Sequence, residues 1–379
     1  MINTDRLILE FKTLLTIESP SLKEGKLAYY LADLFDALGY SIYIDKSAEL
    51  TGSEVGNLII KIPGTVEGPT LLFCAHLDTV GPYENPEIIE EGEVIKSNGK
   101  TILGADDKAG IAILVEIAKV LKENSFPHPP LEFVFTTAEE IGLLGAKYLD
   151  YKHIKASFGF VLDAEKPSDV IIAAPSSYQF ILKVFGKSAH AGIEPEKGIN
   201  AIKLLAQIVV NLPTGRIDHE TTMNIGKING GNYVNIVPDL AFIEGEMRSH
   251  SEEKLEELKK EVENIAEDII KNSTPKIDNL PSYKLDFKRV FKAFKISEEE
   301  PLIQVIKEAG KNLGIPLEFK VKEGGSDANI LNERGIKSVI LGTGMQRVHT
   351  TEEFIKKSDL IKASQLVLEI IKIAGKNPF

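Results

Sequence analysis

The sequence predicts an α/β protein with a mixed, mostly parallel sheet, into which a smaller α+β domain is inserted. Residues 71–75 form an unbroken apolar run, which is typical of a strand buried on both faces. Such runs alternate with helical periodicities up to Asp163, as expected for a parallel-rich sheet. After Ser176 the order changes to strand, helix, two strands, helix and strand, which predicts a compact unit of the split βαβ kind.

The 379 residues are enough for two domains with separate cores. We expect a discontinuous first domain at 1–176 and 296–379, and an inserted lid domain at 177–295. In the first domain, apolar spacing predicts helices at 5–17, 23–38, 108–122, 139–149, 299–313, 324–331 and 358–374. The predicted strands there are 40–44, 57–62, 71–75, 131–137, 158–162, 317–321 and 337–341, with a hairpin-bearing loop at 79–100.

The inserted domain follows from the same criteria. Alternating apolar residues predict strands at 178–185, 221–228, 240–248 and 284–294. Helical periodicity predicts helices at 198–212 and 252–271, and the second of these carries many charged residues. This order gives the α+β unit a four-stranded sheet with two helices.

Composition excludes several classes of function. The formal net charge of −12 argues against nucleic acid and anionic membranes as partners, because both need a basic face. No apolar stretch is long enough to span a bilayer. The single cysteine, Cys74, lies in a predicted buried strand and is expected to be a core residue. Without a cysteine framework or an apolar leader, the sequence predicts a cytoplasmic protein.

Polar side chains follow the buried strand at 71–75. His76 and Asp78 lie at alternate positions, so both side chains point to one side of the strand end, where open α/β sheets bind ligands. Histidine is a common zinc ligand, and a neighbouring carboxylate can fix its tautomer. On its own, this pair is as compatible with a capped strand end as with a metal site.

Four further segments are predicted to end strands in the same way. They begin at Thr101, Phe133, Phe158 and Arg347, and they supply Asp106, Glu140, Asp163 and His349, with Glu139 beside them. Two histidines and three carboxylates suit a pair of zinc ions that share one carboxylate. Acidic residues that cap or begin a helix are the structural alternative for Asp106 and Glu139.

The blocks HLDTV, GADDKAG, TTAEEIG, SAHAG, NIVPD and GGSDAN occur in this order along the chain. In these blocks the sequence resembles the M20 metallopeptidases, and most of all their peptidase T (tripeptidase) branch. The resemblance implies a zinc-exopeptidase-like fold with two Zn²⁺ per subunit, for which Co²⁺ or Mn²⁺ could substitute. The ligands it implies are His76, Asp106, Glu140, Asp163 and His349, with Asp106 bridging the two ions.

The same resemblance implies three catalytic roles. Glu139 would be the general base that takes a proton from a metal-held water and passes it to the leaving amine. Asp78 would orient His76. His190, in the lid, would reach into the partner subunit's site and polarise the scissile carbonyl, so a homodimer through the lid domain is expected. A turn histidine without a catalytic role is the alternative for His190.

Further residues match substrate-binding positions of the family. They are Asn235, Arg248, Gly325 and Ser326. Arg248 suits bidentate capture of a terminal carboxylate, which would limit substrates to short peptides or carboxylate-bearing amides. Glycine at 325 would allow the backbone to approach a ligand closely.

Together these observations predict a zinc-dependent exopeptidase of the aminopeptidase or tripeptidase type. An aspartate at position 163 favours substrates with a free amino end, by the same resemblance. The short stretch 79–100, where tripeptidases carry a longer insertion, leaves tripeptide specificity open. The alternatives are an M20-type deacylase or carboxypeptidase acting on N-acyl amino acids and, more distantly, a non-catalytic metal-dependent binding protein. Glu139 counts against the last, because binding needs no general base.

Overall fold

The computed structural model describes residues 1–376, which divide into two compact units. Unit 1 comprises Met1–Ala173, Lys295–Lys322 and the chain from Ser326 onward, and unit 2 comprises Ala174–Phe294 with Glu323–Gly325. The short segment Glu323–Gly325 groups with unit 2 because Gly325 packs on the ring of Phe291, where a Cβ atom would lie 2.3 Å from a ring carbon.

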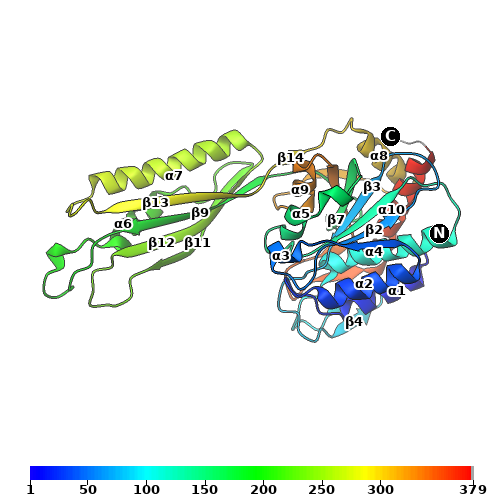
Figure 1. The fold of residues 1–379 in the computed structure, drawn as a ribbon, viewed down its shortest axis with the longest axis horizontal. Coiled ribbons are helices and arrows are strands. Elements are labelled where there is room, and N and C mark those ends of the chain that lie inside the picture. The colour runs from blue at the N-terminus through cyan, green and yellow to red at the C-terminus, as the bar shows by residue number, and fades with distance from the viewer. Residues whose placement is uncertain (377–379) are drawn as a thin grey trace. The chain divides into compact units, whose positions relative to one another are not determined.

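A nine-stranded mixed sheet forms the centre of unit 1 (Figure 1). The strands in spatial order are β1 (Ser41–Ile44), β2 (Leu58–Ile62), β6 (Leu131–Thr136), β3 (Leu71–His76), β7 (Phe158–Ala164), β16 (Lys337–Gly342), β8 (Asp169–Ala174) and β14 (Phe294–Lys295), with β15 (Glu318–Val321) paired to β8. The central strands β6, β3, β7 and β16 are parallel, whereas β1 and β2 join one edge antiparallel and β8 pairs antiparallel with β16. The predicted mostly parallel α/β fold is confirmed.

The core of this sheet explains the apolar runs. Every residue of β3 and β6 is buried, as expected for strands covered on both faces. Phe73 of β3 stacks on Phe160 of β7 at a ring-centroid distance of 4.9 Å and meets Phe133 of β6 edge-on. The central strands are therefore fixed by aromatic packing close to the edge that carries His76.

Helices pack around this sheet. They are α1 (Thr4–Leu15), α2 (Gly25–Ala37), α3 (Ala48–Thr51), α4 (Ala105–Glu123), α5 (Leu144–Tyr148), α8 (Pro301–Leu313), α9 (Asp327–Glu333) and α10 (Lys357–Lys376), with a 3₁₀ turn at Tyr151–His153. α4 is buried along most of its length, and it packs on β3, α1 and α10. Its regular helical dihedrals begin at Lys108, where the sequence predicts the helix to start.

Two predictions for this unit are wrong. The helix predicted at 139–149 is reduced to α5, because Ala138 and Leu143 adopt left-handed φ angles of 52° and 59° that a right-handed helix cannot contain. β8 was not predicted as a strand. The four-residue segment between Ala138 and Leu143 is instead a turn, and it carries Glu139 and Glu140.

A small antiparallel sheet links the 79–100 stretch to the C-terminal part of unit 1. Its strands are β17 (Met345–Gln346), β18 (Phe354–Lys356), β5 (Val94–Ser97) and β4 (Ile88–Glu91), in this order. The predicted hairpin in 79–100 is confirmed as β4 and β5. His349 lies in the connection from β17 to β18, so this sheet supports the chain that carries it.

Unit 2 contains a five-stranded antiparallel sheet and two helices. The strands in order are β10 (Gly215–Arg216), β11 (Thr221–Gly230), β12 (Leu240–Ser249), β9 (Ser176–Phe185) and β13 (Ser282–Phe291), and the helices are α6 (Ala201–Asn211) and α7 (Glu252–Asn272). Apolar residues of one sheet face pack on both helices to form the core. α7 buries Leu255, Leu258, Val262, Ala266 and Ile270 at helical spacing and leaves its charged face to solvent.

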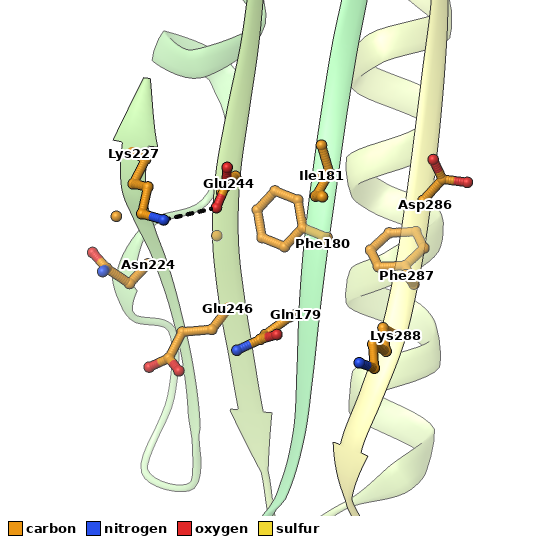
Figure 2. A pocket seen from close by; sticks show the side chains of 12 residues that line it. Gln179, Phe180, Ile181, Asn224, Lys227, Glu244, Glu246, Asp286, Phe287 and Lys288 are labelled. Atoms are coloured by element: carbon orange, nitrogen blue, oxygen red, sulfur yellow. Dashed lines mark hydrogen bonds and ion pairs between the residues drawn. The ribbon is translucent and has the colours of Figure 1, made fainter. Parts of the chain in front are cut away.

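The other face of this sheet carries polar side chains among apolar ones. Figure 2 shows side chains around a shallow hollow of about 700 Å³, among them Gln179, Glu244, Glu246 and Lys288. Lys227 forms an ion pair with Glu244 at 3.1 Å there. Within residues 1–376, no helix has the length and apolar character needed to cross a membrane.

Candidate metal centre

His76 and Asp163 lie at the carboxyl ends of two neighbouring parallel strands. β3 and β7 pair from Leu71 with Phe158 to Cys74 with Val161, and the same register brings His76 level with Asp163. Adjacent strands run about 5 Å apart, so these two side chains start from neighbouring positions at one sheet edge. Both residues are buried.

Asp106 reaches the same place by a different route. The segment before it forms no strand, so the predicted strand end at Asp106 is wrong; the residue lies at the irregular start of α4. Glu353, a buried residue close to His349, accepts hydrogen bonds from the backbone N–H groups of Gly104 at 2.7 Å and Asp106 at 3.0 Å. This carboxylate therefore fixes the backbone that presents Asp106.

The two carboxylate oxygens of Asp106 face two different histidines. Oδ1 lies 3.0 Å from Nε2 of His76, and Oδ2 lies 3.2 Å from Nε2 of His349. Nε2 of His349 is also 2.9 Å from Oε1 of Glu140. His349 follows the two-residue strand β17 through a turn and is not a strand end as predicted, and its φ is 63°.

Asp78 supports the turn that carries Glu139 and Glu140. Its carboxylate accepts hydrogen bonds from the backbone N–H of Glu139 at 2.9 Å, from that of Glu140 at 3.2 Å and from the hydroxyl of Ser21 at 2.7 Å. Nδ1 of His76 lies 2.9 Å from the backbone carbonyl oxygen of Asp78 and 3.7 Å from its carboxylate. The main chain of Asp78 thus makes the closer contact with His76, and its side chain holds the acidic turn.

Two further buried residues follow Asp106. The carboxylate of Asp107 accepts hydrogen bonds from the backbone N–H of His76 at 3.2 Å and of Gly110 at 3.1 Å, and the peptide bond between Asp106 and Asp107 is cis. Lys108 donates to the Tyr83 hydroxyl at 2.9 Å and to the backbone carbonyl of Ile17. These contacts attach the segment that carries Asp106 to β3 and to the N-terminal region.

The carboxylates and histidines strongly perturb one another. Burial opposes the charge on His76, but Asp106 and Asp78 outweigh it and raise its pKa well above the ordinary value. Contacts with Asp106 and Glu140 raise the pKa of His349 to about 10. Burial raises the pKa of Glu140 and, much more strongly, that of Glu139. Such strong shifts within one cluster are typical of a functional site.

The donor set fits a divalent metal. Among the residues that the structure describes, His76, Asp106 and Glu140 bring one ligand atom each to within 4.8 Å of one another. Imidazole nitrogens and carboxylate oxygens are the ligands expected for zinc or a similar ion. Each carboxylate oxygen of Asp106 faces a different histidine. This is the arrangement expected of a carboxylate that two ions share.

Asp163 has a different immediate partner. The ammonium group of Lys322 donates to Oδ2 of Asp163 and to its backbone carbonyl, both at 3.1 Å. Burial opposes the charge on Lys322, but Asp163, Asp106 and Glu139 outweigh it and raise the pKa of the ammonium. A fixed positive charge therefore lies beside one predicted ligand.

Three family models match parts of the chain. A peptidase dimerisation domain of the M20 type matches residues 172–274, the model of peptidase family M28 matches residues 57–201, and that of the M42 glutamyl aminopeptidases matches residues 293–366. The first covers most of unit 2, and the other two cover the segments that supply the predicted ligands.

Full-length relatives are more informative. An uncharacterised protein, YqjE of Bacillus subtilis, is 38% identical and covers 99% of this chain and 100% of its own length. A tripeptidase from Staphylococcus aureus is 36% identical, covers 100% of both chains and superposes with a TM-score of 0.92. Aminopeptidase PepT from Bacillus cereus is 37% identical, covers 98% of both chains and has a TM-score of 0.88. The chain belongs to the M20 peptidases. Within them it is peptidase T-like, as the sequence blocks predicted, and it is an enzyme of the hydrolase class.

In unit 2 of this M20 peptidase, His190 lies in an exposed loop beyond β9. Its Nδ1 accepts a hydrogen bond from the backbone N–H of Gly192 at 3.1 Å, which leaves Nε2 as the protonated nitrogen of the neutral ring. The backbone carbonyl of Asn235 accepts from the N–H of Ala191 at 3.0 Å, so Asn235 lies on the chain beside His190. The structure brings these two predicted residues together.

Arg248 lies at the other end of the same sheet. It sits near the end of β12, paired with Ser177 at the start of β9, and its Nη2 donates to Glu246 at 3.0 Å. Its Nε is buried and has no partner within the described chain. Of the predicted glycine-loop residues, Gly325 belongs to unit 2, and Ser326 belongs to unit 1, where it is buried and caps the start of α9.

Sequence reasoning missed three residues that support the site. Glu353 holds the Asp106 loop, Lys322 contacts Asp163, and Glu24 accepts hydrogen bonds from the N–H groups of Leu22 and Ala138, each at 2.9 Å. Glu353 could have been noticed because two acidic residues follow His349 at three and four positions. Lys322 and Glu24 occur in ordinary charged stretches that carry no such hint.

Proposed function

We propose that this M20 peptidase is a di-zinc exopeptidase that releases amino acids from short peptides, with an aminopeptidase or tripeptidase type of specificity. The observation that carries the proposal is the placement of Asp106, whose two oxygens face His76 and His349 at 3.0 and 3.2 Å. One ion would be held by His76, Asp106 and Asp163, and the other by Asp106, Glu140 and His349. When bound, the ions would polarise the scissile carbonyl and lower the pKa of a water molecule between them.

Glu139 suits the role of general base. Within residues 1–376, no hydrogen bond or ion pair reaches its carboxylate, although its backbone N–H is held by Asp78. Burial raises its pKa well above the ordinary value of a glutamate, which makes the carboxylate a stronger base. A carboxylate with these properties can take a proton from water and deliver it to the leaving amine.

The test is Glu139→Gln, which keeps the size of the side chain and removes the base. We expect the variant to bind the same amount of zinc as the wild type and to unfold at a similar temperature. Its kcat for short peptides should fall by about 10²–10⁴-fold. Glu165→Gln is the matched control, because Glu165 is exposed close to the site and should be dispensable. Turnover within tenfold of the wild type in Glu139→Gln would refute the role.

A substrate panel separates the proposal from its main alternative. Free di- and tripeptides, their N-acetylated forms and N-acyl amino acids should be compared at equal concentration by amine release. Cleavage of the free peptides alone would support the amino-end specificity that Asp163 favours. Cleavage restricted to the N-acylated compounds would instead identify a deacylase or carboxypeptidase.

The chain has one cysteine, which is buried and forms no disulfide, and this suits the proposed cytoplasmic location.

The substrate site would also need a second copy of the chain. β12 rises about 3.4 Å per residue, so the eight steps from Leu240 to Arg248 span about 27 Å, and His190 pairs with Ile236 beyond Leu240. A tripeptide is about 10 Å long. If His190 and Arg248 both contact one short substrate, they must therefore come from two different subunits.

Unit 2 offers a surface for such a homodimer. Strand β10 covers only the first residues of β11, so the remaining edge of β11 has no partner strand within the described chain. Exposed apolar side chains occur on and near this edge, among them Ile202, Val210, Ile228, Tyr233 and Val234. An open strand edge beside apolar residues favours pairing with a second copy.

Complementation between two inactive variants tests the shared site. In our proposal each site takes Glu139 from one subunit and His190 from the other. Mixing the variants Glu139→Gln and His190→Ala, with subunit exchange, should restore activity, because half of the sites in each heterodimer then have both residues. Absence of recovery, when native mass spectrometry shows that heterodimers have formed, would contradict the role of His190 across the dimer.

A further inference from the structure

The two predicted metal positions differ in charge. His349 contacts the carboxylates of both Glu140 and Asp106 directly. Asp163, in contrast, already has a cation beside it, because the ammonium of Lys322 lies 3.1 Å from its Oδ2. No lysine or arginine within the described chain forms an ion pair with Glu140.

Lys322 is held in place by its backbone and by its charge. Its N–H donates to the carbonyl oxygen of Ala173 at 2.9 Å, next to the end of strand β15. Its ammonium donates to both the side chain and the main chain of Asp163, which is 7% exposed at its side chain. Asp106 and Glu139 also attract this ammonium. The lysine, whose side chain is 30% exposed, is therefore a component of the carboxylate cluster.

We propose that Lys322 is a positioning residue that makes metal loading sequential. Its charge lowers the affinity for the ion held by His76, Asp106 and Asp163. The affinity for the ion held by Asp106, Glu140 and His349 is lowered less. This inference rests on the proposed two-ion centre. In the metal-free enzyme the ammonium neutralises part of the carboxylate cluster. Once both ions are present, it repels the nearer one while its hydrogen bond keeps Asp163 in place.

The repulsion is large enough to measure. An ion bound to a carboxylate oxygen of Asp163 would lie roughly 5 Å from the ammonium, given bond lengths of about 2 Å to an oxygen ligand. Even at the dielectric constant of bulk water, a single and a double positive charge at that separation change a binding constant by about tenfold. The effect on the more distant ion is smaller. Loss of the hydrogen bond to Asp163 acts in the opposite direction, but removal of a charge beside a divalent ion should dominate.

The experiment compares Lys322→Met with the wild type and with two controls. Lys322→Arg keeps the charge, and Lys320→Met removes the same charge two residues away, where Lys320 pairs with Asp169 and Glu318 at 2.7 and 2.8 Å. Zinc is titrated into each metal-free protein in competition with a chromophoric chelator. Native mass spectrometry counts the ions bound at each point, and thermal unfolding is recorded without metal and with excess zinc.

We expect the wild type to bind two zinc ions with dissociation constants that differ by more than tenfold. In Lys322→Met the dissociation constant of the more weakly bound zinc ion should fall by about ten- to hundredfold. The metal-free variant should unfold at a lower temperature than the wild type, because its carboxylates lose their cation. Lys322→Arg and Lys320→Met should resemble the wild type. If the dissociation constant of the more weakly bound ion is unchanged or higher in Lys322→Met, the inference is overturned. A wild type that binds only one ion at saturation would overturn the two-ion centre itself.

Discussion

Replacement of Asp78 by asparagine tests which contact of this residue matters most. One carboxylate oxygen accepts from the N–H of Glu139 at 2.9 Å, and the other accepts from Ser21 at 2.7 Å and from the N–H of Glu140 at 3.2 Å. Asparagine can keep the first bond if its amide nitrogen faces Ser21, whose hydroxyl can turn to accept. The N–H of Glu140 then meets another donor and loses its partner.

The cost follows from that single lost bond. Leaving one buried donor unpaired costs about 1–3 kcal/mol, so Asp78→Asn should lower the free energy of unfolding by that amount. Asp78→Ala leaves both N–H groups and Ser21 without the carboxylate and should cost about 3–5 kcal/mol. Because the turn carries Glu139 and Glu140, kcat of Asp78→Asn should fall about 10–100-fold.

The assay combines kinetics with metal binding. Nδ1 of His76 is closer to the backbone carbonyl of Asp78, at 2.9 Å, than to its carboxylate, at 3.7 Å. Zinc affinity of Asp78→Asn should therefore stay within about threefold of the wild type, and Ser21→Ala should change little. If zinc affinity falls by tenfold or more while kcat of the fully loaded enzyme is preserved, the side chain acts through His76, and the assignment to the acidic turn is refuted.

Three further outcomes are expected. Burial raises the pKa of Glu353 to about 7, above its ordinary value of 4.5, so the metal-free protein should lose roughly 1–3 kcal/mol of stability as the pH rises through this interval. Urea unfolding of Glu353→Gln should lack that slope. Removal of zinc by a chelator should lower the unfolding temperature by about 5–10 °C when the free zinc concentration is otherwise about one hundred times the dissociation constant. Addition of zinc should restore the original unfolding temperature. Val234→Glu places a charge among the exposed apolar residues of unit 2 and should give a monomer in size-exclusion chromatography, with little peptidase activity.

Sequence reasoning was most successful where a ligand ends a buried strand. The apolar run before His76 and the run before Asp163 each specify a strand, and polar residues directly after such strands must lie at the sheet edge. For Asp106, Glu140 and His349 the sequence supplied the residue types, but the predicted local structure was wrong. These residues lie on turns and on an irregular helix start, which apolar periodicity does not describe.

The turn after β6 shows why local patterns were insufficient. Residues 139–149 contain spacing that favours a helix, yet Ala138 and Leu143 adopt left-handed dihedrals that are unusual for residues other than glycine. Contacts distant in sequence impose this conformation, since the N–H of Ala138 donates to Glu24 and that of Glu139 to Asp78. No rule based on neighbouring residues could include partners 61 and 114 positions away.

The predicted ligands therefore fall into two physically different groups. His76 and Asp163 are carried by paired strands in a core of stacked aromatic rings, so the fold itself fixes their separation. Asp106, Glu140 and His349 are carried by connections, and two of these are held by buried carboxylates, Glu353 for the first and Asp78 for the second. Substitution of a buried carboxylate that holds a connection should disturb that connection without unfolding the sheet. Substitution of core residues in β3 or β7 should instead reduce stability and metal binding together. The comparison of Asp78→Asn with a core change such as Phe73→Leu tests this division, because only the second should lower zinc affinity in proportion to stability.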